Sequence, residues 1–73
     1  MSKKKKDLLI GIIQKYMAIS GYADYKVLAS ALGMTYRTFL RRIAEPELFT
    51  MGEMNRIKRF LKIPPEELSE VWG

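Results

Sequence analysis

The chain has 73 residues, with 13 Lys and Arg, 8 Asp and Glu, and neither Cys nor His. This length has room for one small hydrophobic core, and the missing residue types exclude disulfides, thiolate zinc sites and catalysis by a thiolate or an imidazole. The net charge of +5 favours an anionic partner, and the 48% apolar content is typical of a folded chain. We expect no cofactor and no metal.

The first six residues contain a run of four like charges, Lys3 to Lys6. Such a run repels itself, so we predict a flexible basic arm over residues 1–6 and a single domain over residues 7–73. The apolar run from Leu8 to Ile13 is too short to span a membrane, and no small-residue cleavage site follows it as in a signal peptide. We therefore expect a cytoplasmic protein with no membrane partner.

Local signals predict helices over residues 7–20, 24–32 and 35–44. The first has apolar residues at helical spacing and ends at Gly21. Asp24 is a favourable N-cap for the second helix, and Gly33 suits the left-handed position that follows it. Thr35 is an N-cap for the third helix, and Pro46 closes it.

Two further helices are predicted over residues 50–61 and 65–71. Thr50 and Glu53 have the spacing of a capping box, and Pro65 suits the first position of the last helix. No segment has the pattern of a strand, so the sequence predicts an all-α, compact five-helix bundle. Its core is expected to include Ile13, Leu28, Ala29, Leu32, Phe39, Ile43, Ile57 and Leu61.

The most informative segment is the helix pair between Tyr25 and Ala44. The turn is so short that the two helices must cross steeply, as in a helix-turn-helix. Ala29 is small enough for a close approach, Gly33 provides the conformation of the turn, and Phe39 points into the core. The third helix carries three arginines and no acid. Arginines can bond guanine edges in the major groove, although an exposed helix face also carries solvated arginines.

These residues resemble a known family. Leu28-Ala29, the run from Ala31 to Thr35, and Phe39 resemble the helix-turn-helix of lambda-type repressors and Cro proteins. The stretch from Phe49 to Leu68 is similar to the last two helices of that fold, so the resemblance covers about residues 7–70. The family usually has an apolar residue nine positions after the turn glycine, where this chain has Arg42, and Ile43 follows it.

The resemblance implies a lambda-repressor-like DNA-binding domain whose third helix enters the major groove. The residues expected to contact bases are Tyr36, Arg37 and Arg41. The residues expected to contact the DNA backbone are Lys3, Lys4, Lys5, Lys6, Tyr25, Lys26, Thr35, Thr38, Arg42, Thr50, Met51 and Gly52. For the basic arm, a solubilising tail is the alternative.

We therefore expect a sequence-specific, double-stranded DNA-binding regulator of transcription, associated with the nucleoid. A small Cro-like repressor, encoded by a phage, a prophage or a chromosome, would act by occluding a promoter. The alternative is an antitoxin or another protein-interaction module on the same fold. We expect no enzyme and no small-molecule ligand, because a bundle this small without His or Cys offers no obvious catalytic pocket.

A weak homodimer is also expected. Helix-turn-helix proteins commonly pair about a two-fold axis, which sets two half-sites one helical turn apart on DNA. The predicted interface is the fifth helix, at Leu68, Val71 and Trp72. The alternative is that this helix covers its own core and that any dimer forms on the first helix, at Leu8 and Ile10.

Overall fold

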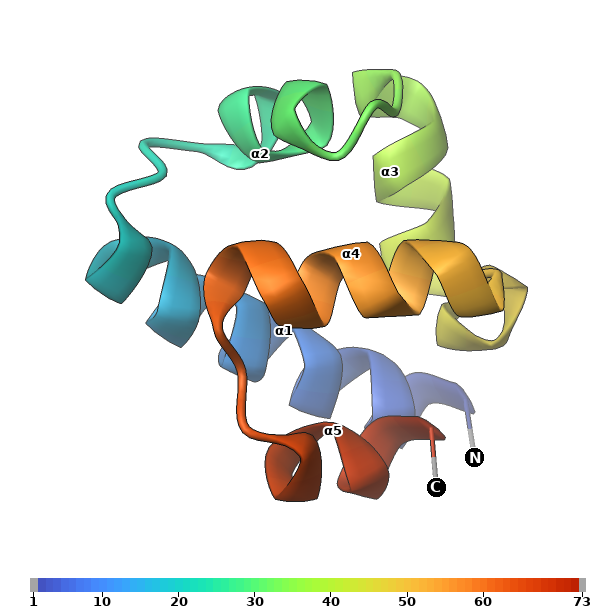
Figure 1. The fold of residues 1–73 in the computed structure, drawn as a ribbon. Helices are drawn as coiled ribbons and strands as arrows, with labels where there is room; N and C mark the ends of the chain where they lie inside the picture. The colour runs from blue at the N-terminus through green and yellow to red at the C-terminus, as the bar shows by residue number, and fades with distance from the viewer. Residues whose placement is uncertain (1, 73) are drawn as a thin grey trace.

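Residues 2–72, the part of the chain that the computed structural model describes, form five α-helices and one 3-10 turn, with no strand (Figure 1). The elements are α1 (Ser2–Ser20), α2 (Tyr25–Ala31), α3 (Tyr36–Ala44), η1 (Pro46–Leu48), α4 (Met51–Leu61) and α5 (Pro65–Trp72). The all-α, five-helix prediction is confirmed, although the sequence did not predict η1. No helix in this range is long and apolar enough to cross a membrane.

The N-terminus differs from the sequence expectation. Helix α1 begins at Ser2 rather than at Asp7, so the backbone of Lys3–Lys6 is helical instead of forming a flexible arm. Lysine is a good helix former, and repulsion between like charges one helical turn apart costs only about 0.2–0.5 kcal/mol per pair. No Gly or Pro separates the basic run from the apolar residues that follow. Met1 and the side chains of Lys3 and Lys4 lie outside the described residues.

Side-chain caps fix where three helices begin. Asp24 accepts a hydrogen bond of 3.0 Å from the backbone N–H of Val27, at the start of α2. Thr35 accepts one of 3.1 Å from the N–H of Thr38, at the start of α3. Helix α4 begins with the complete capping box that the sequence predicted at Thr50. Each cap satisfies a backbone donor that a helix leaves unpaired in its first turn.

Left-handed residues end the helices before the next element begins. Gly21 and Gly33, with φ of 83° and 75°, end α1 and α2. At the second of these turns, the N–H of Met34 donates to the carbonyl of Ala29 at 2.9 Å, which closes the helix end. Lys62 takes the same conformation after α4, with φ of 55°, although a side chain disfavours it.

The core lies around α1, which contacts α3, η1, α4 and α5. Figure 1 shows α5 at the bottom of the molecule, α1 and α4 above it, and α2 with α3 at the top. All eight residues predicted for the core are buried, and Leu9, Met17, Phe49, Ile63, Leu68 and Val71 join them. The described residues contain no buried polar or charged side chain, so apolar packing alone forms this core.

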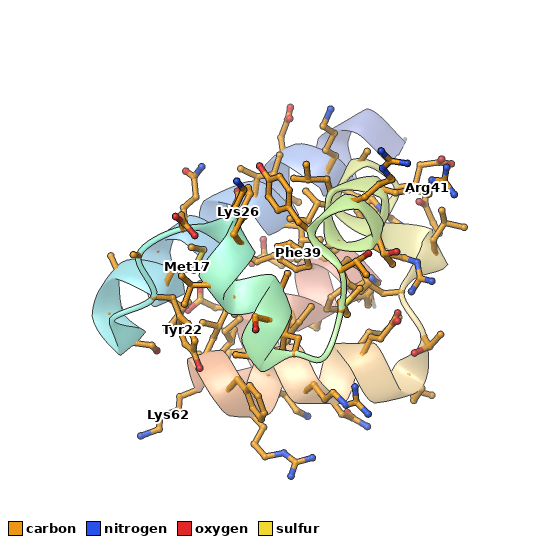
Figure 2. All side chains as sticks on the ribbon, turned by 90° about the horizontal axis from the view of Figure 1, so that it is seen from above. Met17, Tyr22, Lys26, Phe39, Arg41 and Lys62 are labelled. Carbon is orange, nitrogen blue, oxygen red and sulfur yellow. The ribbon has the colours of Figure 1, made fainter. Side chains whose placement is uncertain are left out.

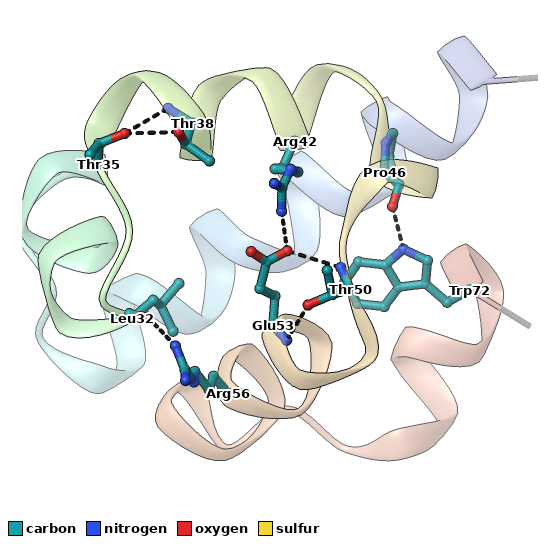
Figure 3. Close-up of polar contacts among 9 residues, drawn as sticks. All are labelled: Leu32, Thr35, Thr38, Arg42, Pro46, Thr50, Glu53, Arg56 and Trp72. Atoms are coloured by element: carbon teal, nitrogen blue, oxygen red, sulfur yellow. Dashed lines mark hydrogen bonds and ion pairs between the residues drawn. The ribbon is translucent and has the colours of Figure 1, made fainter.

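Helix α5 packs on the core of its own chain. Leu68 and Val71 are 6% and 1% exposed. Trp72 is half-buried; its ring lies edge-on to Phe49 with centroids 5.4 Å apart, and its Nε1 donates a 2.8 Å hydrogen bond to the carbonyl of Pro46 (Figure 3). The predicted dimer interface at Leu68, Val71 and Trp72 is therefore not an open surface. A small domain uses these side chains to complete its own core.

Polar side chains join α1 to α5 at the rim. The hydroxyl of Tyr16 donates to the carboxylate of Glu67, and the same carboxylate lies 3.6 Å from the ammonium of Lys15. The hydrogen bond to Glu67 raises the pKa of Tyr16 above its ordinary value of 10.0. These contacts fix α5 against α1 from the solvent side.

Candidate nucleic-acid interface

Helix α3 is anchored by one face and free on the other. Phe39 and Ile43 are 0% and 4% exposed, and the ring of Tyr25 from α2 packs edge-on against Phe39 at 5.7 Å. Successive residues of a helix turn by about 100°, so Arg37 and Arg41 lie nearly opposite the buried pair. The core thus fixes the orientation of α3, and that orientation points these two arginines outward.

Of the residues predicted to contact bases, Arg37 and Arg41 lie on the outward face of α3, and Tyr36 lies on its flank toward α2. Tyr36 is 42% exposed, and Arg37 and Arg41 are exposed. Figure 2 shows Arg41 at the outer edge of the molecule and Phe39 inside it. Among the described side chains, neither arginine forms an ion pair. The chain also has no acidic residue between Asp24 and Glu45, so α3 itself carries only positive charges.

The caps at the start of α3 orient its first turn. Thr35 is exposed, while Thr38 is half-buried. The Thr35 hydroxyl donates to the Thr38 hydroxyl at 2.9 Å while it also accepts from the Thr38 N–H (Figure 3). These bonds hold both side chains beside Arg37 and Arg41, at the edge of the outward face. Hydroxyls in this position can bond phosphate oxygens.

The start of α2 lies beside the first turn of α3. The ammonium of Lys26 lies 5.5 Å from the centre of the Tyr36 ring, so a cation–π contact joins the two helices. Lys26 is exposed and free to approach an anion. Tyr25 is less available than the sequence prediction assumed: its ring packs on the core, and its hydroxyl accepts a 3.4 Å hydrogen bond from Gln14.

The start of α4 presents backbone donors to solvent. Thr50, Met51 and Gly52 are exposed, and Met51 is exposed to 76%. The backbone N–H of Thr50 donates to Glu53 at 2.9 Å, whereas helix geometry leaves the N–H groups of Met51 and Gly52 without a partner in the helix. These two groups, rather than side chains, are what this segment can offer to a phosphate.

Arg42 forms an ion pair that the sequence prediction did not include. Its guanidinium pairs with the carboxylate of Glu53, and the two side chains are only 24% and 18% exposed (Figure 3). Burial opposes ionisation of Glu53, but the Thr50 N–H and the Arg42 guanidinium outweigh it, so the pKa of Glu53 lies below its ordinary 4.5. Arg42 therefore joins α3 to α4 and is not a free phosphate ligand.

Arg56 has a structural role that the sequence interpretation missed. Its guanidinium donates a 3.0 Å hydrogen bond to the carbonyl of Leu32, at the end of α2 (Figure 3). A Cβ on Gly33 would lie 3.5 Å from the same guanidinium. The sequence signal for this contact is weak, because an arginine in the middle of a charged helix face is typical of many solvated helices.

The basic run is divided between described and undescribed side chains. Lys5 is exposed and Lys6 is half-buried, whereas Lys3 and Lys4 lie outside the described side chains. Helix α1 contacts η1, which directly follows α3 in the chain, and Figure 1 shows the start of α1 on the side where α3 ends. The basic run is therefore held near one end of α3.

Comparisons with protein-family models, with curated proteins and with solved structures found no match to this chain.

Proposed function

We propose that this protein is a sequence-specific, double-stranded DNA-binding regulator with a lambda-repressor-like helix-turn-helix formed by α2 and α3. One observation carries the proposal: the outward face of α3 presents Arg37 and Arg41 without an ionic partner among the described residues, while Phe39 and Ile43 fix the helix from behind. Exposed arginines on a rigid helix suit bidentate bonding to guanine in the major groove.

Within this proposal, α3 reads the bases and its neighbours position it. Arg37 and Arg41 bond base edges, and Tyr36 lies beside them. Lys26 and the N–H groups at the start of α4 bond phosphates on either side of the groove. Such a domain regulates transcription most simply as a small Cro-like repressor, by covering a promoter.

Binding to duplex DNA of random sequence tests the electrostatic part of the proposal. If about four phosphates are neutralised, the logarithm of the affinity falls with the logarithm of salt concentration with a slope of about −3.6. Fluorescence anisotropy of a labelled duplex measures this slope. A slope near zero would instead favour the protein-interaction module.

Selection of a preferred site from a random library tests the specific part. Arg37→Ala and Arg41→Ala should each cost about 1–3 kcal/mol on the selected site and relax preference at one base pair. The matched control is Lys58→Ala with Lys62→Ala, which removes one exposed charge from α4 and one from the residue that follows it. If the control changes site preference as much as the α3 variants do, α3 is not the recognition helix.

A further inference from the structure

The second half of α4 is strongly basic. No acidic residue lies between Glu53 and Glu66, and the cations in that interval are Arg56, Lys58, Arg59 and Lys62. None of these cations takes part in an ion pair among the described residues, where the two pairs are Lys15 with Glu67 and Arg42 with Glu53. This end of α4 therefore carries a local charge that the fold itself does not neutralise.

Apolar side chains are exposed among these cations. Ile19 at the end of α1 is 68% exposed, and Phe60 of α4 is 36% exposed. Neither of them belongs to the buried core or to the partly buried apolar residues packed against it. We call the surface formed by Ile19, Arg56, Arg59, Phe60 and Lys62 the α4 basic surface.

Two hollows flank Phe60 on this surface. One lies toward α2 and is bordered by Leu32, Gly33, Arg56 and Arg59. The other lies toward α1 and is bordered by Ile19, Tyr22 and Lys62. Phe60 lines both hollows, and each hollow has at least one cation at its rim. An apolar side chain on each side of Phe60 would be buried while its acidic neighbours reach the cations.

Arg56 is held in place at the first hollow. Its hydrogen bond to the Leu32 carbonyl uses one of the five N–H donors of a guanidinium, so the others stay available. Gly33 has no side chain to fill the space beside it. A cation that is already fixed loses less conformational entropy on binding than a free one.

We propose that the α4 basic surface docks an acidic segment of a partner protein, with two apolar side chains that straddle Phe60. The mixture of cations and exposed apolar groups favours such a segment over DNA, whose backbone has charge but little apolar surface. Figure 2 shows Lys62 on the opposite side of the molecule from Arg41, so this end of the α4 basic surface lies away from the outward face of α3.

A synthetic peptide tests the proposal on the full chain without DNA, so its outcome is independent of the proposed DNA binding. The probe is a fluorescein-labelled peptide rich in Glu and Asp, with two leucines one helical turn apart. We expect it to bind in an anisotropy titration, and Arg59→Glu to weaken the affinity about tenfold. Chemical-shift changes in NMR spectra should centre on Phe60 and Ile19.

Matched controls separate docking from diffuse attraction. Lys58→Glu makes the same charge change on the other flank of α4, beside Met54, and should weaken binding by less than about threefold. A peptide with serines in place of the leucines should bind about tenfold more weakly, which corresponds to two partly buried leucines. Far-UV circular dichroism checks that each variant is folded.

Three results would overturn the proposal. The first is that the leucine peptide does not bind, or binds no better than the serine peptide. The second is that Lys58→Glu weakens binding as much as Arg59→Glu does, which means attraction to net charge alone. The third is that Arg59→Glu abolishes binding to duplex DNA or to phosphatidylserine vesicles but leaves peptide binding unchanged, which assigns the surface to that other partner.

Discussion

Replacing Trp72 should destabilise the isolated domain, because its side chain completes the core of its own chain. The Nε1 hydrogen bond to Pro46 is 2.8 Å long, and the Pro46 carbonyl also accepts the N–H of Phe49 at 3.2 Å. Trp72→Phe therefore leaves that carbonyl with one partner and should cost about 1 kcal/mol. For a domain of this size, the melting temperature should fall by about 4–8 °C.

Trp72→Ala should cost more. It also removes the edge-on contact with Phe49, and such aromatic pairs contribute about 0.5–1.5 kcal/mol beyond the area that they bury. A fully buried aromatic replaced by alanine costs about 3–5 kcal/mol, and Trp72 is half-buried, so we expect about 2–4 kcal/mol. Thermal and urea unfolding followed by circular dichroism measure the loss. Tyr36→Ala, at a more exposed aromatic, is the control and should cost no more than about 1 kcal/mol, the upper value for an exposed cation–π contact such as the one with Lys26.

Protein concentration distinguishes this role from a dimer contact. The stability of a dimer rises with protein concentration, whereas that of a monomer does not. The wild-type melting temperature and Trp72 emission should therefore be the same in dilute and concentrated samples. If Trp72→Ala unfolds like the wild type, or if wild-type stability rises with concentration and the variant's does not, the intramolecular role of Trp72 is wrong.

Three further predictions follow from the backbone and the caps. Gly33→Ala should cost about 1–2 kcal/mol in urea unfolding, because the residue has φ of 75° and alanine disfavours that conformation. Lys62→Gly should raise stability by up to about 1 kcal/mol for the converse reason, and an unchanged or lower melting temperature would contradict it. Because the pKa of Glu53 is lowered on folding, its contribution is present above the ordinary value of 4.5 and is lost as pH falls through the folded value. Urea unfolding of Glu53→Gln should therefore lose less stability on acidification than the wild type does.

The helices were predictable because their signals are local. Asp24, Thr35 and Thr50 cap helices through bonds to residues three positions away, and Gly33 ends a helix by its own conformation. The same locality explains the wrong start of α1. Repulsion within Lys3–Lys6 is a local signal, but it is weaker than the tendency of an uninterrupted segment to extend a helix that already exists.

The tertiary contacts of long side chains were not predictable from such local signals. From the sequence alone, an aromatic residue near the end of a short helix could pack on its own core or on a partner's surface. The hydrogen bond to Pro46 shows that Trp72 packs on its own core. Glu53 was predicted as a cap, but its second partner is Arg42, which lies eleven residues away on another helix. Such contacts depend on how two helices cross, and spacing along one helix contains no information on that crossing.

The position of Arg42 suggests how α3 and α4 are kept in register. Arg41 and Arg42 are adjacent in sequence, yet the turn of the helix sends one outward and the other toward α4. The carboxylate of Glu53 accepts from both Arg42 and the Thr50 backbone, so one side chain caps α4 and fixes α3 against it. Recognition of a duplex needs the base-reading side chains and the phosphate-binding N–H groups at a set distance from each other. In the proposed function, the ion pair of Arg42 with Glu53 maintains that distance, and the neighbouring Arg41 forms hydrogen bonds with the base edges.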